Sequence, residues 1–339
     1  MKRITTHGRF LAFAAIIAVL TTFTLTSFKS QEKIKIGFLV HDLVSERWKT
    51  DMETFANKVE ELGGVAITKN AFGDAHTQVA QGKSLIDEGV KVLAVVAQDG
   101  AILGELVDYA EKAGAKIIAY DRMILNSNLE YYISYNSISV GELMADYALK
   151  LKPKGNYVII NGPSTDNNSL LIEQGVKNKL NKHIERGDVK VVFEKEADAW
   201  YALNAMLMMD EFLSSNPDTP IDVIIAAADD LATGAIDAIK SSNKGTPIVL
   251  GQDATVDACK NIILGHQTMT IYKPIKKLSS EAAILAMKVA KNEKVEFTAK
   301  LNNGKVDVPS ILFDPIVITK ENLRKTLIAD QHIKEADLR

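Results

Sequence analysis

Residues 34–68 read IKIGFLVHDLVSERWKTDMETFANKVEELGGVAIT, and this stretch decides the fold class. The apolar run over 34–40 predicts a buried strand. Apolar side chains then recur at helical spacing from Trp48 to Leu62, and Gly63-Gly64 ends the predicted helix. A second strand follows over 65–68. This order of strand, helix and strand predicts an α/β protein built on a parallel sheet.

The same alternation continues along the chain in two series, the second of which begins near Val140. The later strands of the first series are predicted over 90–96, 116–120 and 131–135, and those of the second over 157–160, 189–193, 223–227 and 248–251. A chain of 339 residues is long for a single hydrophobic core. The sequence therefore predicts a doubly wound α/β fold in two lobes, with no Pro/Gly/Ser-rich linker between them.

Composition and motifs argue against several classes of function. A net charge of −3 gives no electrostatic reason to expect a nucleic-acid partner. The chain has no glycine-rich phosphate loop after its first strand and no G-x-S-x-G elbow of a serine hydrolase. Its six histidines lack the spacing of metal ligands, so we expect no metal and no cofactor. Cys259 is the single cysteine, which excludes an intrachain disulfide and suggests a buried thiol.

The amino-terminal residues 1–30 have the layout of a signal peptide or a membrane anchor. Met1-Lys2-Arg3 and Arg9 precede an uncharged, apolar and threonine-rich run over 10–28. The run is nearly long enough to span a bilayer, and its cleavage site is poorly defined. No cysteine follows the run, which excludes a lipid anchor there. We expect a periplasmic or otherwise extracytoplasmic protein, and leave open whether the segment is cleaved or retained as a tether.

Polar side chains follow several predicted strands at the point where each strand ends. They are Asp121-Arg122 after 116–120, Asp166-Asn167-Asn168 after 157–160, Gln252-Asp253 after 248–251 and Lys273 after 268–272. Ligands of open parallel sheets bind at the carboxyl ends of the strands. Trp48 and Trp200 add flat rings that suit the apolar faces of a sugar, although Trp48 equally fits the core of its helix. The pattern predicts a site for a small, neutral, polyhydroxylated ligand.

With these residues in place, the chain resembles the type I sugar-binding family of bacterial ABC importers, and within it the periplasmic D-xylose-binding group. The likeness runs from about Lys33 to the carboxyl end. It rests on SERW (45–48), AYDRM (119–123), YISY (132–135), DNN (166–168), GQDA (251–254), QTMTIYKP (267–274) and LNNG (301–304).

The resemblance implies two Rossmann-like lobes joined by three hinge crossings that close over one monosaccharide. The amino-terminal lobe would comprise 33–135 plus 273–304, and the carboxyl-terminal lobe 136–272 plus 305–330. Residues 331–339 would form a tail. The crossings are expected near 135–136, near 271–272 and over 304–309.

On the family pattern, the first lobe contributes Arg47, Trp48, Asp121 and Arg122 to the sugar site. The second lobe contributes Asp166, Asn168, Trp200 and Asp253, and Lys273 lies near the crossings. Two departures stand out. Ala228-Asp229-Asp230 replaces the usual Asn-Asp, so one ligand amide is lost unless Asp229 or Asp230 substitutes for it, and we include Asp229 in the site. His41-Asp42 replaces an acidic pair.

The resemblance implies a monomeric, non-catalytic receptor that delivers a monosaccharide, D-xylose in the first place, to an ABC permease. Another pentose or a hexose stays open as the ligand. An alternative is a sugar receptor that signals through a membrane sensor kinase or a chemoreceptor. A sugar-responsive transcription regulator is disfavoured, because an apolar run stands where a basic helix-turn-helix would be needed.

Overall fold

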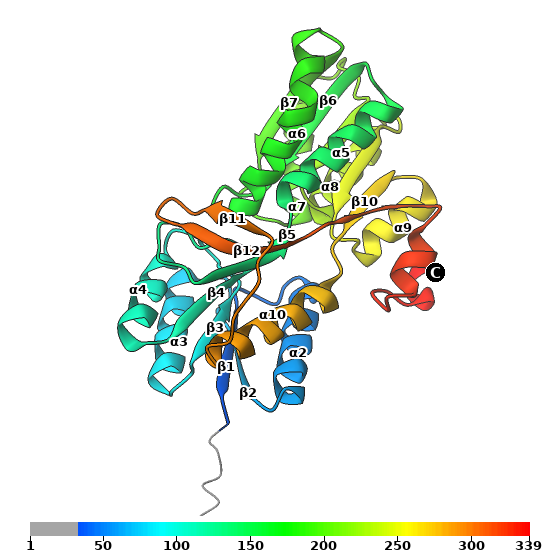
Figure 1. Cartoon of the computed structure of the whole chain (residues 1–339). Helices are drawn as coiled ribbons and strands as arrows, with labels where there is room; N and C mark the ends of the chain where they lie inside the picture. Colours follow the sequence, from blue (N-terminus) through cyan, green and yellow to red (C-terminus); the bar gives the residue numbers. More distant parts are fainter. Residues whose placement is uncertain (1–32) are drawn as a thin grey trace, which may run out of the picture. The chain divides into compact units, whose positions relative to one another are not determined.

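A computed structural model describes residues 33–339, which form two α/β lobes, each built on its own sheet (Figure 1). The predicted signal or anchor segment, residues 1–30, lies outside the described residues. None of the helices between residues 33 and 339 combines the length and apolar character that crossing a bilayer requires. The two-lobed α/β fold predicted from the sequence is confirmed.

The first lobe is organised around a seven-stranded sheet in the order β11-β12-β5-β4-β3-β1-β2. Its strands are β1 (Lys35–Val40), β2 (Val65–Asn70), β3 (Val92–Val95), β4 (Lys116–Tyr120), β5 (Tyr131–Tyr135), β11 (Ala299–Asn302) and β12 (Asp307–Phe313). All pair in parallel except β11 with β12. Its helices are α2 (Glu46–Glu61), α3 (Ala75–Asp87), α4 (Gly104–Ala113) and α10 (Ile275–Ala290).

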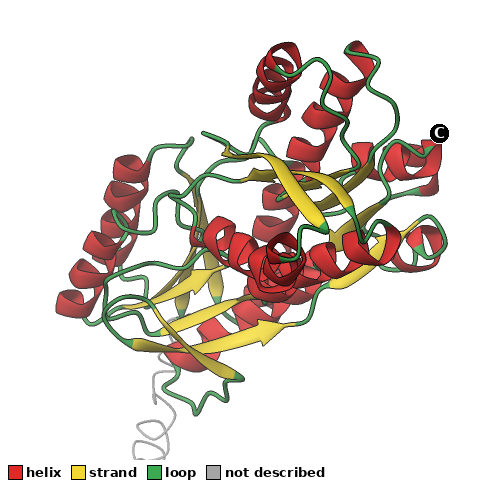
Figure 2. Ribbon diagram, turned by 90° about the horizontal axis from the view of Figure 1, so that it is seen from above, coloured by secondary structure: helices red, strands yellow, loops and turns green. Residues whose placement is uncertain are grey.

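Successive side chains of each strand point to opposite faces of this sheet, so the sheet contributes to two hydrophobic cores. Ile36, Phe38 and Val40 of β1 pack with α2 and α10, whereas Leu39 packs on the other side with α3 and α4. Helices therefore cover both faces (Figure 2). A sheet buried on both faces explains why its central strands are apolar throughout.

The second lobe contains a six-stranded sheet in the order β13-β10-β9-β8-β6-β7. Its strands are β6 (Gly155–Asn161), β7 (Val189–Glu196), β8 (Val223–Ala226), β9 (Ile248–Gln252), β10 (Met269–Tyr272) and β13 (Ile316–Thr319). Its helices are α5 (Ser137–Leu151), α6 (Asn167–Glu185), α7 (Ala202–Ser215), α8 (Asp229–Ser241) and α9 (Val256–Leu264). α5 packs against α6, and α7 packs against α8.

The chain passes between the two sheets after β5, after β10 and between β12 and β13. The sequence predicts the third crossing over 304–309, but β12 pairs with β5 and Ser310 lies opposite Tyr132. That prediction is wrong, and residues 305–313 belong to the first lobe. The reason is that Asn303-Gly304 forms the turn of the β11–β12 hairpin, with φ of 95° at Gly304.

The carboxyl-terminal residues fold onto the second lobe beside α9. Leu323, Leu327, Ile333 and Leu338 are buried in a small core that also contains Cys259. The predicted buried thiol is thus confirmed. Residues 331–339, expected as a tail, are part of this packed unit.

Candidate functional site

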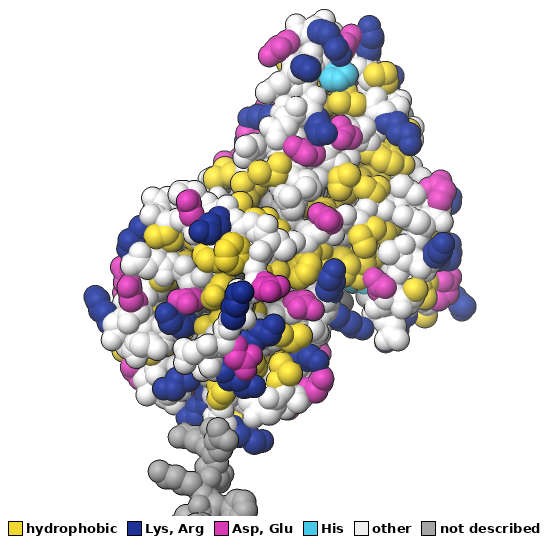
Figure 3. Space-filling model, in the orientation of Figure 1, with side chains coloured by type: hydrophobic (Ala, Val, Ile, Leu, Met, Phe, Trp, Pro, Cys, Tyr) yellow, Lys and Arg dark blue, Asp and Glu magenta, His cyan; other side chains and the backbone are white. Residues whose placement is uncertain are grey.

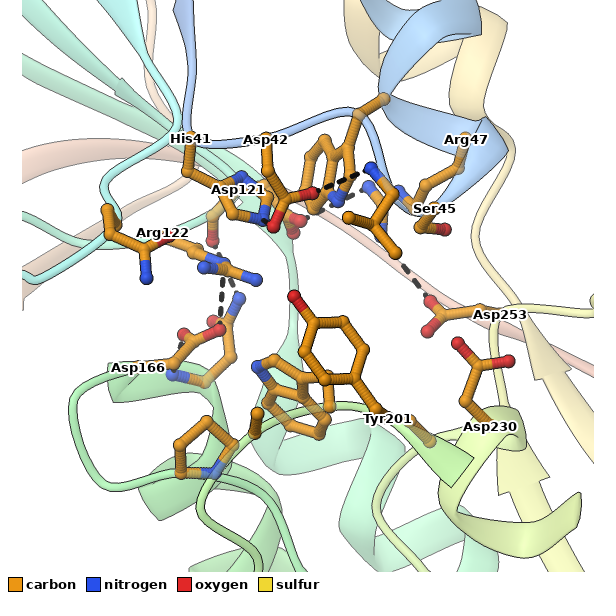
Figure 4. A pocket seen from close by; sticks show the side chains of 18 of the residues that line it. His41, Asp42, Ser45, Arg47, Asp121, Arg122, Asp166, Tyr201, Asp230 and Asp253 are labelled. Carbon is orange, nitrogen blue, oxygen red and sulfur yellow. Dashed lines mark hydrogen bonds and ion pairs between the residues drawn. The ribbon is translucent and has the colours of Figure 1, made fainter. Parts of the chain in front are cut away.

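A cavity of about 170 Å³ lies between the two lobes, near the carboxyl ends of the parallel strands (Figure 4). Its volume is below the range of about 300–1,000 Å³ that is usual for drug-sized ligands, so it suits one small molecule. Nine of the ten residues predicted from the sequence line this cavity. They are Arg47, Trp48, Asp121, Arg122, Asp166, Asn168, Trp200, Asp253 and Lys273.

Arg47 connects carboxylates of both lobes. It lies in the first turn of α2, and its Nη2 is 3.1 Å from Oδ2 of Asp121, in the same lobe. Its Nη1 is 3.4 Å from Oδ1 of Asp253, which follows β9 in the other lobe. Its Nε faces Asp51, one helical turn further along, at 3.4 Å. Burial opposes protonation of Arg47, but the three carboxylates outweigh burial and raise its pKa.

Arg122 and Asp166 form a second pair across the lobes. Arg122 Nε lies 2.8 Å from Asp166 Oδ2, and the two side chains are 9% and 4% exposed. Asp166 caps α6, because its Oδ1 accepts a hydrogen bond from the Asn168 backbone N–H at 3.0 Å. Burial raises the pKa of Asp166, and Arg122 opposes that shift. The pair is therefore both a lobe contact and part of the cavity wall.

Asn168 and Asp121 form a third contact between the lobes. Asn168 Nδ2 donates to the backbone carbonyl of Asp121 at 2.9 Å, and its Oδ1 accepts from the Ser137 hydroxyl at 2.9 Å. Burial raises the pKa of Asp121, but Arg47, Lys273 and Arg122 together outweigh it, so the pKa is lowered. Asp121 is therefore an ionised acceptor at neutral pH.

Lys273 stands where β10 leaves the second lobe, and its Nζ is 3.0 Å from Oδ1 of Asp253. Asp253 thus receives one cation from each side of the cavity, Arg47 and Lys273. A carboxylate can accept several hydrogen bonds, so Asp253 keeps lone pairs for a ligand beside these two cations.

The two tryptophans line the cavity from opposite lobes. Trp48 is only 5% exposed, its ring meets His41 edge to face at 4.8 Å, and the Arg47 guanidinium lies 4.1 Å above it. Trp48 thus serves the core and the cavity at once. Trp200 packs against Gly162, where an added Cβ would collide with the indole ring. Gly162 is therefore needed for this position of Trp200.

Four buried polar atoms on cavity-lining residues have no hydrogen-bond partner among the described residues. They are His41 Nδ1, Gln98 Oε1, Trp200 Nε1 and Gln252 Oε1. Burial, with Arg122 and Arg47 nearby, lowers the pKa of His41 well below its usual value, so its ring is neutral. Buried polar groups are normally paired, so these four atoms are candidate hydrogen-bond partners for a polar ligand of the cavity.

Comparison with known proteins decides the family. Residues 36–294 match the periplasmic binding protein domain. The chain belongs to the periplasmic binding protein family.

Within the family, the chain is 38% identical to the D-xylose-binding periplasmic protein of Haemophilus influenzae, over 96% of this chain and 98% of that protein. It is 36% identical to the Escherichia coli protein of the same name, over 95% and 98%. A solved ABC transporter solute-binding protein from Clostridium phytofermentans, with bound β-D-glucose, matches with a TM-score of 0.85 at 27% identity. That match covers 90% of this chain and all of the other. The resemblance stated from the sequence is confirmed.

The tenth predicted residue of this binding protein, Asp229, lies away from the cavity. It is fully buried and accepts hydrogen bonds from Gln267 Nε2 at 2.8 Å, Thr255 N–H at 3.0 Å and the Thr270 hydroxyl at 2.9 Å. Burial raises its pKa well above the usual value. Its neighbour Asp230 lines the cavity instead, beside Asp253 (Figure 4). Of the two carboxylates that we named as substitutes for the lost amide, the geometry favours Asp230.

Several cavity residues were not among the ten predicted. They are His41, Asp42, Ser45, Gln98, Tyr201, Asp230 and Gln252, among others. Gln98 follows β3 closely, so the rule that polar residues gather at strand ends would have found it. Tyr201 had no such signal, because it depends on the path of the loop before α7.

Proposed function

We propose that this protein is an extracytoplasmic receptor that captures one monosaccharide, D-xylose, between its lobes and delivers it to an ABC importer. The observation that carries the proposal is a polar cavity whose walls come from both lobes, in a chain that matches periplasmic D-xylose-binding proteins over nearly its whole length. We further propose that the receptor acts as a monomer and performs no catalysis.

The charges of the cavity argue against an anionic ligand. Among the described residues, Arg47, Arg122 and Lys273 are the cations that line it, and each already pairs with a carboxylate. An anionic ligand would have to compete for these cations. Asp198 and Asp230 line the cavity without an ion-pair partner in the described part of the chain. Hydroxyl groups that donate to carboxylates and accept from guanidinium groups suit this surface.

Charged side chains of both signs are interspersed over the face of the molecule drawn in Figure 3. That face shows no continuous basic surface of the kind that follows a nucleic-acid backbone. This face therefore gives no support to a nucleic-acid partner.

We expect the hinge to close over the ligand, because the proposed ligand contacts come from both lobes. Arg47, Asp121 and Arg122 belong to one lobe, whereas Asp166 and Asp253 belong to the other. A sugar that contacts both sets binds the closed form more tightly than the open form, and so shifts the equilibrium towards closure. The closed lobes then present a different surface to the permease.

At position 228 the cavity lacks the amide side chain that is usual in the family, because the residue is Ala. Ala228 lines the cavity without a polar side chain, and Asp230 supplies a carboxylate two residues later. The expected consequence is a stronger demand for a hydroxyl donor on that side of the sugar, because a carboxylate only accepts.

Calorimetry with a sugar panel tests the proposal. We expect D-xylose to bind with one site per chain and more tightly than D-ribose, L-arabinose, D-glucose or myo-inositol. D-xylonate, which carries a carboxylate, is the matched control and should not bind. Recovery of unchanged D-xylose would agree with a receptor that performs no chemistry. Absence of binding by every neutral sugar would refute the proposal.

A further inference from the structure

The carboxylate of Asp253 is carried by a strained turn. Asp253 has a φ of 102° and the next residue, Ala254, a φ of 53°. Positive φ is uncommon outside glycine, and it persists where surrounding contacts impose it. Two such residues in succession, at the end of β9, mean that the position of this carboxylate depends on what holds the turn.

Hydrogen bonds from within the sheet hold the first part of the turn. The Asp253 N–H donates to the Ile271 carbonyl at 2.7 Å, and the Ala254 N–H donates to the Thr270 hydroxyl at 3.2 Å. Asp229, the buried carboxylate outside the cavity, accepts from both Thr270 and the Thr255 N–H. Asp229 therefore acts on the turn rather than on the ligand.

One further contact comes from the carboxyl-terminal residues. His332 Nε2 lies 2.9 Å from the Ala254 carbonyl oxygen, which makes Nε2 the donor, since a carbonyl only accepts. The imidazole ring also packs on Tyr272, with ring centroids 4.7 Å apart. Tyr272 directly precedes Lys273, whose ammonium pairs with Asp253. The His332 side chain thus contacts the residue that follows Asp253, through its backbone carbonyl, and the residue that precedes Lys273, through its ring.

His332 itself is fixed by the packed carboxyl-terminal segment. Its backbone N–H donates to the Leu327 carbonyl at 2.9 Å, and the next residue, Ile333, is buried in the core beside α9. The ring is therefore held from its own side as well as from the turn.

We propose that His332 is a positioning residue for the ligand-binding pair Asp253–Lys273, so that the carboxyl-terminal segment 331–339 is a functional part of the sugar site. This inference rests on the proposed function. His332 does not line the cavity, so it acts through the turn and not through contact with the sugar.

The test compares His332→Leu with His332→Gln by calorimetry with D-xylose. Leu removes the donor and keeps apolar volume, whereas Gln keeps an N–H donor near the place of Nε2. We expect the Leu variant to raise Kd about tenfold or more and the Gln variant to stay within about threefold of wild type. Glu335→Ala is the control, because Glu335 lies in the same segment and its ion pair among residues 33–339 is with the exposed Arg324.

A second measurement separates positioning from general damage. On an Asp253→Asn background, His332→Leu should change Kd by less than about threefold, because the two residues act as a unit. A repeated tenfold loss there, or equal losses for Leu and Gln, would overturn the inference. If His332→Leu does not fold, His332→Asn takes its place. The Asn side chain is one bond too short for its amide to reach the Ala254 carbonyl. We then expect His332→Asn to raise Kd about tenfold or more in the wild-type background and to change it by less than about threefold in the Asp253→Asn background.

The two proposals fail in different ways. A wild-type chain that binds no sugar of the panel overturns the proposed function and this inference together. A wild-type chain that binds D-xylose, beside a His332→Leu variant of unchanged affinity, overturns this inference alone.

Discussion

Replacing Arg122 by Met should weaken sugar binding about a hundredfold while leaving the ligand-free protein almost as stable as wild type. The substitution removes the guanidinium and keeps an unbranched apolar chain of similar reach. In this structure Arg122 Nε lies 2.8 Å from Asp166 Oδ2, and both side chains are more than nine-tenths buried. In an open form, water would reach both groups. The charge on Asp166 therefore becomes uncompensated only when the lobes close.

The magnitude follows from what remains around Asp166. Removing one partner of a buried ion pair costs about 3–5 kcal/mol. Asp166 keeps the hydrogen bond from the Asn168 N–H, so the lower end applies. About 3 kcal/mol corresponds to about a hundredfold in Kd. In the open form the pair would be hydrated and worth at most about 1 kcal/mol, or about 2–4 °C in Tm.

Calorimetry and thermal unfolding of the same preparations measure the two effects. The double variant Arg122→Met with Asp166→Asn is the matched control, because it removes the buried charge together with its partner. We expect the double variant to bind more tightly than Arg122→Met alone. An Arg122→Met protein that binds within threefold of wild type, or a double variant that binds worse than the single one, would refute this reasoning.

Three further predictions concern other parts of the site. Gly162→Ala should displace the Trp200 ring, change the tryptophan emission and weaken binding at least tenfold; an unchanged spectrum and Kd would contradict the packing described. Burial and the nearby carboxylates Asp253 and Asp257 raise the pKa of Asp230 to about 6. Asp230 therefore gains a proton and loses its charge as the pH drops from 7 to 5, and the affinity for D-xylose should fall over this range. Asp230→Asn should make the affinity less dependent on pH. Without sugar the sign reverses: the folded chain keeps a proton that the unfolded chain loses, so the contribution of Asp230 to stability falls as pH rises from about 4 to about 6. Asp229→Ala should lower the free energy of unfolding by about 1–3 kcal/mol in urea titrations, because the three buried donors that bind Asp229 lose their acceptor. An unchanged urea midpoint would show that these donors find other acceptors in the variant.

The parts of the site that follow strands could be predicted from the sequence. Asp121, Asp166 and Asp253 each come after a run of apolar residues too buried to end in solvent by chance. The carboxyl ends of parallel strands share one edge of a sheet, so the sequence positions bring Asp166 and Asp253 to the same edge of the second sheet and Asp121 to the corresponding edge of the first. How these two edges meet depends on the packing of the lobes, which the sequence positions alone do not give. The same rule would have reached Gln98.

The choice between Asp229 and Asp230 could not be predicted, because it depends on the rotation of a helix. Both residues begin α8, and successive helical residues point about 100° apart. Which one faces the cavity is set by how α8 packs against its sheet. The contact of His332 with the turn at Ala254 lay equally beyond prediction, since 78 residues separate them and no periodic pattern links them.

The turn sequence over residues 302–304 is consistent with two kinds of connection, and this explains the wrong prediction of the third crossing. Asn302-Asn303-Gly304 indicates a change of chain direction, which fits both a hairpin and a passage between lobes. The hairpin prevails because β12 continues alongside β5 at the edge of the first sheet. The Asn303 side chain adds hydrogen bonds to the Ile124 and Ser127 carbonyls of the same lobe.

A crystal structure of the protein grown with D-xylose tests the central claim most directly. The account predicts one pentose in the cavity, within hydrogen-bonding distance of Asp121 or Arg122 on one side and of Asp166 or Asp253 on the other. A pentose bound elsewhere, or one held by a single lobe, would contradict it.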